Sequence, residues 1–403
     1  MKICLISKYP PIEGGVSSST YWDARALGEA GHEVFVVSNN WEVEERFREE
    51  IRDDELDKFE PKNVKVFSTQ HLPGFYPPIP YFNPYVEKIA SLAIEVIRKY
   101  GADIIFSNYL LPYGVAAYLS KIATGTPLVT KHAGSDITTL YTSPFLKPIF
   151  MEVFKMSDRI LTGGYHFLSR FGGIERSKLI TDLHPPTDLK FFNPNVEPFD
   201  FSKYTDKDLK VPIFTYFGKI LRMKRTHELI LAASKIKEDF LIFFVTENRG
   251  EALNEIKKLA EAQGLKEKII FLPFQPPWKI PSILKASTCV VCPESNKTYP
   301  TLENPLSIHT PGMAREAMAC GKCVILGEEI KKRYIYQNLE DGANVITVDT
   351  EVVSDFSEKL KFVINNQQEV NKIGVEARKF SEKSENYGEY IKRLVNLFED
   401  VIK

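Results

Sequence analysis

The chain has 403 residues, enough for two or three domains, and its 43% hydrophobic, 12% aromatic and 26% charged content is that of a globular protein, which excludes disordered and fibrous folds. Its 52 Lys and Arg residues balance 53 Asp and Glu residues to a net charge of -1. No global field therefore favours nucleic acid, and any site for a polyanion must be local.

No apolar run approaches the ~18 residues that a membrane-spanning helix needs, and the first run, Ile3 to Ile6, is too short for the core of a signal peptide. The five cysteines, an odd number in a long chain, fit a reducing compartment better than a disulfide framework. We therefore expect a cytoplasmic protein. Peripheral association with a membrane surface stays open.

The first half of the chain alternates between strand and helix patterns. The expected elements are strands at 3–6, 34–37, 103–106 and 128–130, with helices at 17–30, closed by Gly31, and at 114–122. Because strands that alternate with helices pair in parallel, this pattern predicts a doubly wound α/β sheet with ligands at the carboxyl ends of its strands.

Two stretches interrupt that alternation. Residues 42–62 carry dense charge of both signs, which predicts a solvated helix rather than a binding surface. Residues 71–85 combine five prolines with five aromatic residues. This stiff loop either packs locally over the sheet or forms a wall of an acceptor pocket, since rings stack on sugars and lipids.

A polar stretch without periodicity predicts a linker at 196–212, after a first domain of residues 1–195. Alternation then starts again, which predicts a second domain over 213–375. Its expected strands are 213–217, 240–245, 269–272, 289–292 and 323–326, and its expected helices are 227–236, 251–263, 281–286 and 311–319. The final segment, 376–403, is expected to be helical and to pack back on the first domain.

Two motifs favour a bound anion. Gly14 and Gly15 lie between a strand and a helix, where backbone without Cβ approaches a ligand closely, although ordinary turns also use such glycines. The segment from Gly218 to Arg225 carries four cations after a predicted strand, either to clamp a diphosphate or as a solvated basic loop.

A third motif is the helix that Thr310 and Pro311 begin and Gly321 ends. Gly312 in its first turn leaves room for an anion at the helix N-terminus. Glu316 lies one turn deeper on the same face, where a carboxylate accepts hydrogen bonds from both hydroxyls of a ribose. An exposed Glu on a short helix is the simpler alternative.

Together these residues resemble the retaining nucleotide-sugar glycosyltransferases of family four, over residue 1 to about 390. The matching motifs, in order, are Gly14-Gly15-Val16, His132-Ala133-Gly134-Ser135-Asp136, His184-Pro185-Pro186-Thr187-Asp188, Gly218-Lys219 through Lys224, and Glu316-Ala317-Met318-Ala319-Cys320-Gly321. The resemblance implies a GT-B architecture, in which two Rossmann-like domains face each other across a cleft. The first would hold the acceptor and the second the nucleotide sugar.

The resemblance also implies roles for single residues. The donor would be bound by Gly14, Gly15 and Gly312, with Lys219 and Lys224 on its phosphates and Glu316 on its ribose. His132, Lys224 and Asp136 would form the catalytic set, with His132 at the reacting sugar and Asp136 supporting its loop. A nucleoside-diphosphate sugar is the donor, no metal or further cofactor is required, and the acceptor is a sugar, a lipid-linked molecule or a small molecule.

The sequence departs from that family at two places. Lys219 replaces the usual Arg, which keeps the charge but loses a bidentate fork. The family's first Glu, which touches the transferred sugar, is here Ile308, so that His309 or Glu303 is a candidate replacement.

Other interpretations remain at this point. Cys289-x-x-Cys292 with Cys320-x-x-Cys323 could bind zinc, and Asp206 with Asp208 could bind another metal, but the spacing and positions of both sets are unfavourable. A nucleotide-sugar epimerase and a non-catalytic nucleotide-sugar binding protein share the expected architecture. The base, the sugar, the acceptor and the oligomeric state are not predicted.

Overall fold

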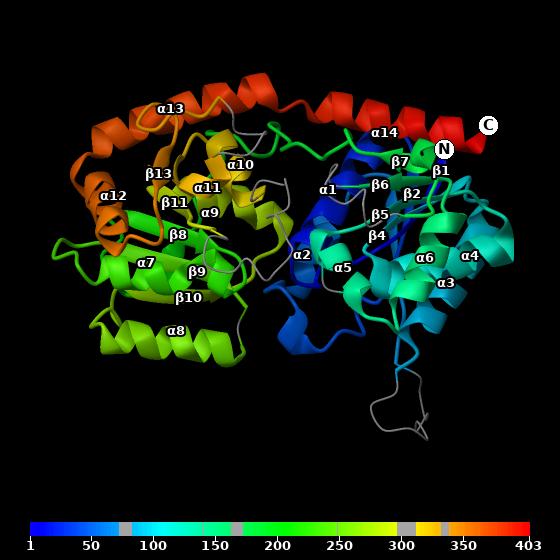
Figure 1. The fold of residues 1–403 in the computed structure, drawn as a ribbon, viewed down its shortest axis with the longest axis horizontal. Coiled ribbons are helices and arrows are strands. Elements are labelled where there is room, and N and C mark those ends of the chain that lie inside the picture. The colour runs from blue at the N-terminus through cyan, green and yellow to red at the C-terminus, as the bar shows by residue number, and fades with distance from the viewer. Residues whose placement is uncertain (72–82, 139, 163–171, 248, 296–311, 332–337) are drawn as a thin grey trace. The chain divides into compact units, whose positions relative to one another are not determined.

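The computed structural model describes residues 1–71, 83–138, 140–162, 172–247, 249–295, 312–331 and 338–403. The chain divides into two compact units, residues 1–185 with 388–403 and residues 186–387, each built on one parallel sheet. Figure 1 shows the strands and the helices that cover them.

The sheet of the first unit has the order β3-β2-β1-β4-β5-β6-β7, and every pairing is parallel. Its strands are β1 (Lys2–Ile6), β2 (Glu33–Ser38), β3 (Val64–Ser68), β4 (Ile104–Asn108), β5 (Leu128–Lys131), β6 (Arg159–Leu161) and β7 (Leu179–Ile180). Its helices are α1 (Gly15–Glu29), α2 (Asp53–Phe59), α3 (Tyr85–Tyr100), α4 (Val115–Thr124), α5 (Gly134–Thr138), α6 (Lys147–Met156) and α14 (Tyr387–Ile402).

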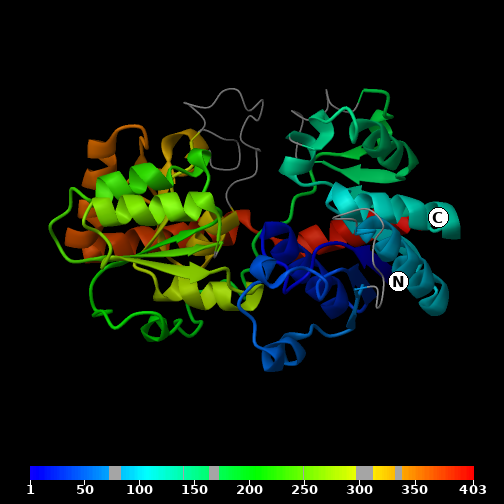
Figure 2. The same cartoon turned by 90° about the horizontal axis from the view of Figure 1, so that it is seen from below.

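Alternate residues of these strands face opposite helix layers, as a strand period of two requires. Cys4 and Ile6 of β1 pack with α3 and α4, in a core that includes Ile89 and Ala116. On β4, Phe106 meets Phe398 of α14, with ring centroids 5.2 Å apart. Helices therefore cover both faces of the sheet (Figure 2), which confirms the predicted doubly wound class.

The second unit repeats this plan with the order β10-β9-β8-β11-β12-β13, again with every pairing parallel. Its strands are β8 (Ile213–Phe217), β9 (Leu241–Thr246), β10 (Ile269–Pro273), β11 (Cys289–Cys292), β12 (Cys323–Gly327) and β13 (Ile346–Val348). Its helices are α7 (Thr226–Ala233), α8 (Glu251–Ala262), α9 (Ile280–Ala286), α10 (Gly312–Ala319), α11 (Glu328–Lys331), α12 (Val353–Asn365) and α13 (Gln367–Ser384).

Both strand orders reverse direction beside the first strand of the unit, between β1 and β4 and between β8 and β11. Such a switch point leaves a crevice at the carboxyl ends of the two strands, since the connecting helices lie on opposite faces. The loops that follow β1, β4, β8 and β11 are therefore the places where a ligand is expected.

The unit boundaries differ from those expected from the sequence. Residues 196–212 lie within the second unit rather than between two domains. There Phe201 stacks on Phe243 of β9, with ring centroids 4.0 Å apart, and the amide of Phe199 donates to the carbonyl of Ser282 over 3.0 Å. The physical reason is that aromatic residues bury this otherwise polar stretch.

The C-terminal segment is also divided. Residues up to 387 belong to the second unit, whereas 388–403 belong to the first. In the first unit, Tyr390 of α14 donates a hydrogen bond to Oδ1 of buried Asp23, over 3.3 Å, and Leu394 is fully buried. Lys131 Nζ lies 3.1 Å from Oδ2 of the same Asp23, so one carboxylate links α14, α1 and β5.

Candidate active site

The loop after β8 carries the predicted phosphate-binding lysines. Gly218 has a φ of 147°, which an L side chain rarely adopts, and the chain then makes a short 3-10 turn over Arg222–Lys224. Lys219 is exposed, and its carbonyl accepts a hydrogen bond from Tyr216 over 2.7 Å. Lys219 and Lys224 both follow the carboxyl end of β8, as the sequence predicted.

Arg225 differs from the other cations of this loop. Its side chain is only 4% exposed and forms ion pairs with Glu228 at 3.0 Å and Glu351 at 2.8 Å. These contacts assign it to the loop's own structure, since a buried charge needs its partners. Arg225 therefore has ion-pair partners within its own unit that distinguish it in the group of four cations predicted from the sequence.

Lys224 forms an ion pair with Glu294, two residues beyond β11. The amide of Ser295 donates to the carbonyl of Met223 over 3.0 Å, so backbone bonding also joins the two loops. Glu294 is a site residue that the sequence analysis did not select. Only the neighbouring positions of β8 and β11 in the sheet bring it to Lys224.

Glu316 lies on α10, and its Oε1 is 4.0 Å from the position that a Cβ on Gly312 would occupy, so the two residues share one face of the helix as the spacing predicted. Burial raises the pKa of its carboxyl to about 7; neighbouring Arg315 opposes that shift and Glu385 adds to it. Gly321 follows the helix with a φ of 72°, which confirms its predicted function as the helix end.

The charges of three of these side chains influence the pKa of the thiol of Cys292 at the end of β11. Burial raises the pKa of that thiol strongly, the charges of Glu294 and Glu316 raise it further, and Lys224 lowers it. Lys224 and Glu294 are therefore in contact beside the switch point of the second sheet, and the charge of Glu316 also reaches the end of β11.

In the first unit, Gly14 and Gly15 follow β1 and begin α1. Gly14 has a φ of 116°, and a Cβ added to either glycine would meet no atom within 4 Å. Open space therefore borders this turn at the carboxyl end of β1 in the first unit. Helix N–H groups face such a position, which suits an anion.

His132 lies directly after β5 and is 8% exposed. Its Nε2 is 2.9 Å from the hydroxyl of Thr162 and its Nδ1 is 3.1 Å from the carbonyl of Ala133. Burial lowers the pKa of the imidazole to about 4, so the ring is neutral at pH 7. These two contacts orient a neutral imidazole at a strand end.

Asp136 is fully buried on α5 and supports the same loop. Its Oδ2 accepts hydrogen bonds from the amides of Ala133, at 2.8 Å, and Leu110, at 3.1 Å. Burial raises the pKa of the carboxyl to about 7, against the effect of these two amides and of Lys8. The carboxyl thus ties the loop after β5 to the loop after β4.

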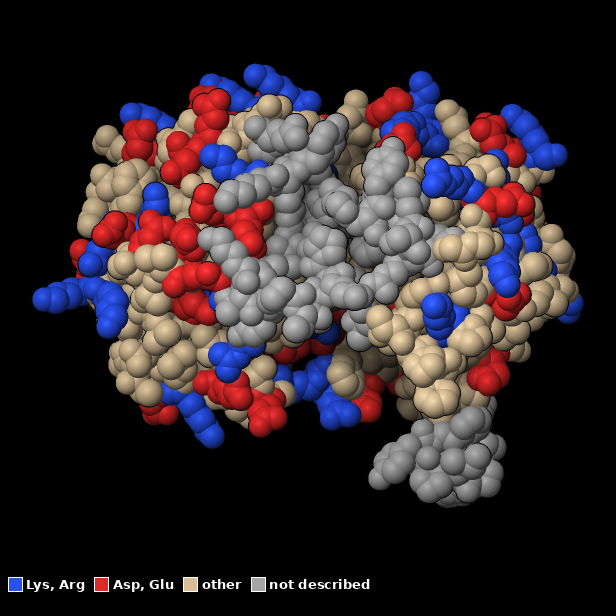
Figure 3. All heavy atoms as spheres, viewed as in Figure 1, with Lys and Arg blue, Asp and Glu red and all other residues tan. Residues whose placement is uncertain are grey.

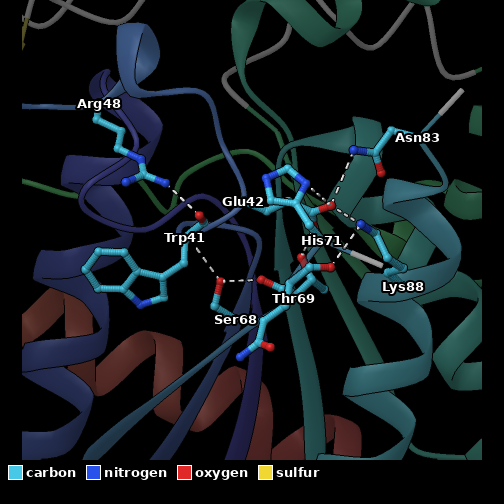
Figure 4. Close-up of polar contacts among 9 residues, drawn as sticks. Trp41, Glu42, Arg48, Ser68, Thr69, His71, Asn83 and Lys88 are labelled. Carbon is cyan, nitrogen blue, oxygen red and sulfur yellow. Dashed lines mark hydrogen bonds and ion pairs between the residues drawn. The ribbon is translucent and has the colours of Figure 1, made fainter. Parts of the chain in front are cut away.

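A second polar cluster in the first unit surrounds Glu42, whose side chain is fully buried (Figure 4). Thr69 donates to its Oε2 over 2.6 Å, Asn83 donates to its Oε1 over 3.3 Å, and Lys88 forms an ion pair with that oxygen. His71 Nδ1 lies 3.9 Å from Oε1.

This cluster corrects the prediction that residues 42–62 form one solvated helix. The stretch contains a 3-10 turn at Glu45–Phe47 and the helix α2, and Glu42 and Glu49 within it are buried. Lys88, 46 residues beyond Glu42, supplies the charge that permits the burial of Glu42. Nothing in the local sequence indicates that partner.

Some predicted residues lie outside the described part of the chain: Glu303, Ile308, His309, Thr310 and Pro311, and residues 72–82 of the aromatic loop.

All five cysteines are free and buried, and Cys289 is in register with Cys323 on the neighbouring strand. Among the described residues, no group of three His, Cys, Asp or Glu side chains is arranged to hold a metal ion.

Over the described residues visible in Figure 3, lysines and arginines alternate with acidic residues rather than forming one large field. This agrees with the balanced composition. Within the described ranges, none of the helices has both the length and the apolar character required to cross a bilayer.

Both units contain a region that matches a known protein family. Residues 13–162 match the family model Glycosyltransferase Family 4, and residues 199–380 match Glycosyl transferases group 1. The structure resembles Anabaena HepE in complex with UDP and glucose, with a TM-score of 0.69 and 16% identity over 99% of this chain and 100% of HepE. It also resembles sucrose-phosphate synthase from Thermosynechococcus elongatus, with a TM-score of 0.69 and 15% identity over 99% and 98% of the two chains.

The fold and the family matches therefore define a glycosyltransferase of the GT-B type. Within that class, the chain has a Family 4 region followed by a group 1 region. It is also similar to N-acetyl-alpha-D-glucosaminyl L-malate synthase of Bacillus anthracis, with 24% identity over 279 residues, 66% of each protein. The epimerase and the non-catalytic binding protein are not favoured, because both family models describe glycosyltransferases.

Proposed function

We propose that this protein transfers a hexose from a nucleoside-diphosphate sugar to an acceptor with retention of anomeric configuration. The observation that carries the proposal is the placement of Lys224 in the loop after β8 and of Glu316 on α10 within the second unit, in a chain whose two halves match glycosyltransferase families. A cation and a ribose acceptor at one strand edge are what a nucleoside diphosphate requires. The complex of HepE with UDP and glucose supports a donor of this class.

In this proposal the second unit binds the donor. Lys219 and Lys224 bind the phosphates, and the N-terminal turn of α10 at Gly312 adds the partial positive charge of a helix end. Glu316, once ionised, accepts both ribose hydroxyls. The leaving diphosphate is stabilised by these fixed groups, so the reaction needs no metal or further cofactor.

The first unit supplies the groups that act at the reacting sugar and the acceptor. Gly14 and Gly15, where an added Cβ would meet no atom within 4 Å, are assigned to donor binding in this proposal. His132 is neutral and is held by Thr162 and the carbonyl of Ala133, so that in this proposal it acts at the reacting sugar without adding charge. Asp136 keeps the loop of His132 in place through two backbone amides.

The test is incubation of the purified protein with a panel of nucleoside-diphosphate sugars and a mixture of sugar, lipid-linked and small-molecule acceptors. Release of the nucleoside diphosphate together with a glycosylated acceptor is the expected result, and the anomeric configuration of the product, read by NMR coupling constants, tests retention. An inverted product refutes retention. An altered sugar without transfer, or binding without turnover, refutes the proposed reaction.

A further inference from the structure

The lysine that the proposed function assigns to phosphate already has a partner. Glu294 pairs with Lys224, and their side chains are only 12% and 25% exposed. The Ser295–Met223 backbone hydrogen bond, at 3.0 Å, holds together the two loops that carry the pair. Because those loops leave neighbouring strands, the contact is built into the sheet and is not a chance meeting of surface side chains.

The carboxylate of Glu294 opposes the binding of an anion at Lys224. Glu294 places a carboxylate against the ammonium of Lys224 in a partly buried position, and the charge of Glu316 reaches the same end of β11. A diphosphate bound to Lys224 has to displace Glu294 from the ammonium and then meets the freed carboxylate. Like charges in a partly buried site repel strongly.

We propose that Glu294 competes with the diphosphate for Lys224, and that hydroxyls of the transferred sugar offset this competition by donating hydrogen bonds to the freed carboxylate. The inference rests on the proposed function, because it takes Lys224 as a phosphate ligand. Glu294 then distinguishes the intact nucleotide sugar from the bare nucleoside diphosphate. After transfer the sugar is gone, Glu294 recovers Lys224, and the product is released.

The test is Glu294→Gln, which keeps the size of the side chain and removes its charge. The first ligand is whichever of ADP, GDP, TDP and UDP binds the unaltered protein most tightly, and the second is the corresponding nucleotide sugar. Calorimetry measures the affinity of each variant for both ligands. Removing a charge-assisted competitor should make the bare diphosphate bind about tenfold more tightly. The intact donor should gain less, so that the ratio of donor affinity to diphosphate affinity falls, by up to about tenfold if the donor gains nothing.

Glu261→Gln is the matched control. It removes the same charge from the same unit, and Glu261 is paired with Lys266 on the surface at 2.7 Å. It should leave both affinities unchanged. Thermal melting of each variant checks that it is folded.

A double variant separates the two proposals. If Glu294 acts through Lys224, then Glu294→Gln should tighten diphosphate binding less in a Lys224→Ala background than in the unaltered protein. Diphosphate binding that is unchanged or weaker in Glu294→Gln, while Lys224→Ala does weaken it, overturns the competition alone. Unchanged binding in Lys224→Ala overturns the phosphate-binding role of Lys224, and the competition with it.

Discussion

Replacing Lys88 by Met removes the ammonium that pairs with Glu42 and keeps a side chain of similar length. The Glu42 carboxylate is fully buried and would retain the neutral donors Thr69 and Asn83, with Nδ1 of the exposed His71 3.9 Å from its Oε1. Breaking a buried pair from one side costs about 3–5 kcal/mol, because the other charge is left without compensation. The first unit has about 200 residues, for which each kcal/mol lowers the melting temperature by about 2–4 °C.

Scanning calorimetry should therefore show the transition of the first unit lowered by roughly 6–20 °C in Lys88→Met. The double variant Glu42→Met/Lys88→Met removes both charges and should be much closer to the unaltered protein, since apolar residues replace a buried pair at little cost. A single variant destabilised by less than about 1 kcal/mol would refute the reasoning. So would a double variant that loses as much stability as the single one.

Three further predictions concern the candidate site. His132→Ala should lower turnover by more than it weakens binding of the bare nucleotide, because the nucleotide lacks the reacting sugar; a fall in thermal stability with unchanged turnover would make His132 structural. Glu316→Ala should weaken nucleotide binding by about tenfold and leave pyrophosphate binding unchanged, and Glu316→Gln should weaken nucleotide binding by an intermediate amount. Equal weakening for both ligands would remove the assignment of Glu316 to the ribose. Asp136 has a pKa of about 7, above its ordinary value of 3.8, so the folded state holds its proton between these pH values and loses stability as the pH rises through them. Asp136→Asn keeps an acceptor for both amides, so its stability relative to the unaltered protein should increase from pH 5 to pH 8. Urea unfolding measures the free energy of unfolding of both proteins, and a difference between them that stays constant across that range would contradict the raised pKa.

Much of the order of strands and helices was predictable from the sequence, because the signals are local. The apolar run at Ile3 to Ile6 and the strands at 213–217 and 289–292 are formed as predicted. The structure likewise places His132 and Lys224 at strand ends, since parallel strands direct their carboxyl ends to one edge of the sheet. The family motifs along the chain predicted the class of enzyme that the comparisons support.

Tertiary structure decided the partners and the unit boundaries. Lys224 and Glu294 are 70 residues apart, and Glu42 and Lys88 are 46 residues apart, so no local period relates either pair. The helix α3, which carries Lys88, was not predicted. The sequence of the C-terminal segment predicts helices throughout, but only its last 16 residues belong to the first unit. The sheet against which an apolar face packs depends on contacts between distant segments, and the pattern along one segment does not predict that partner.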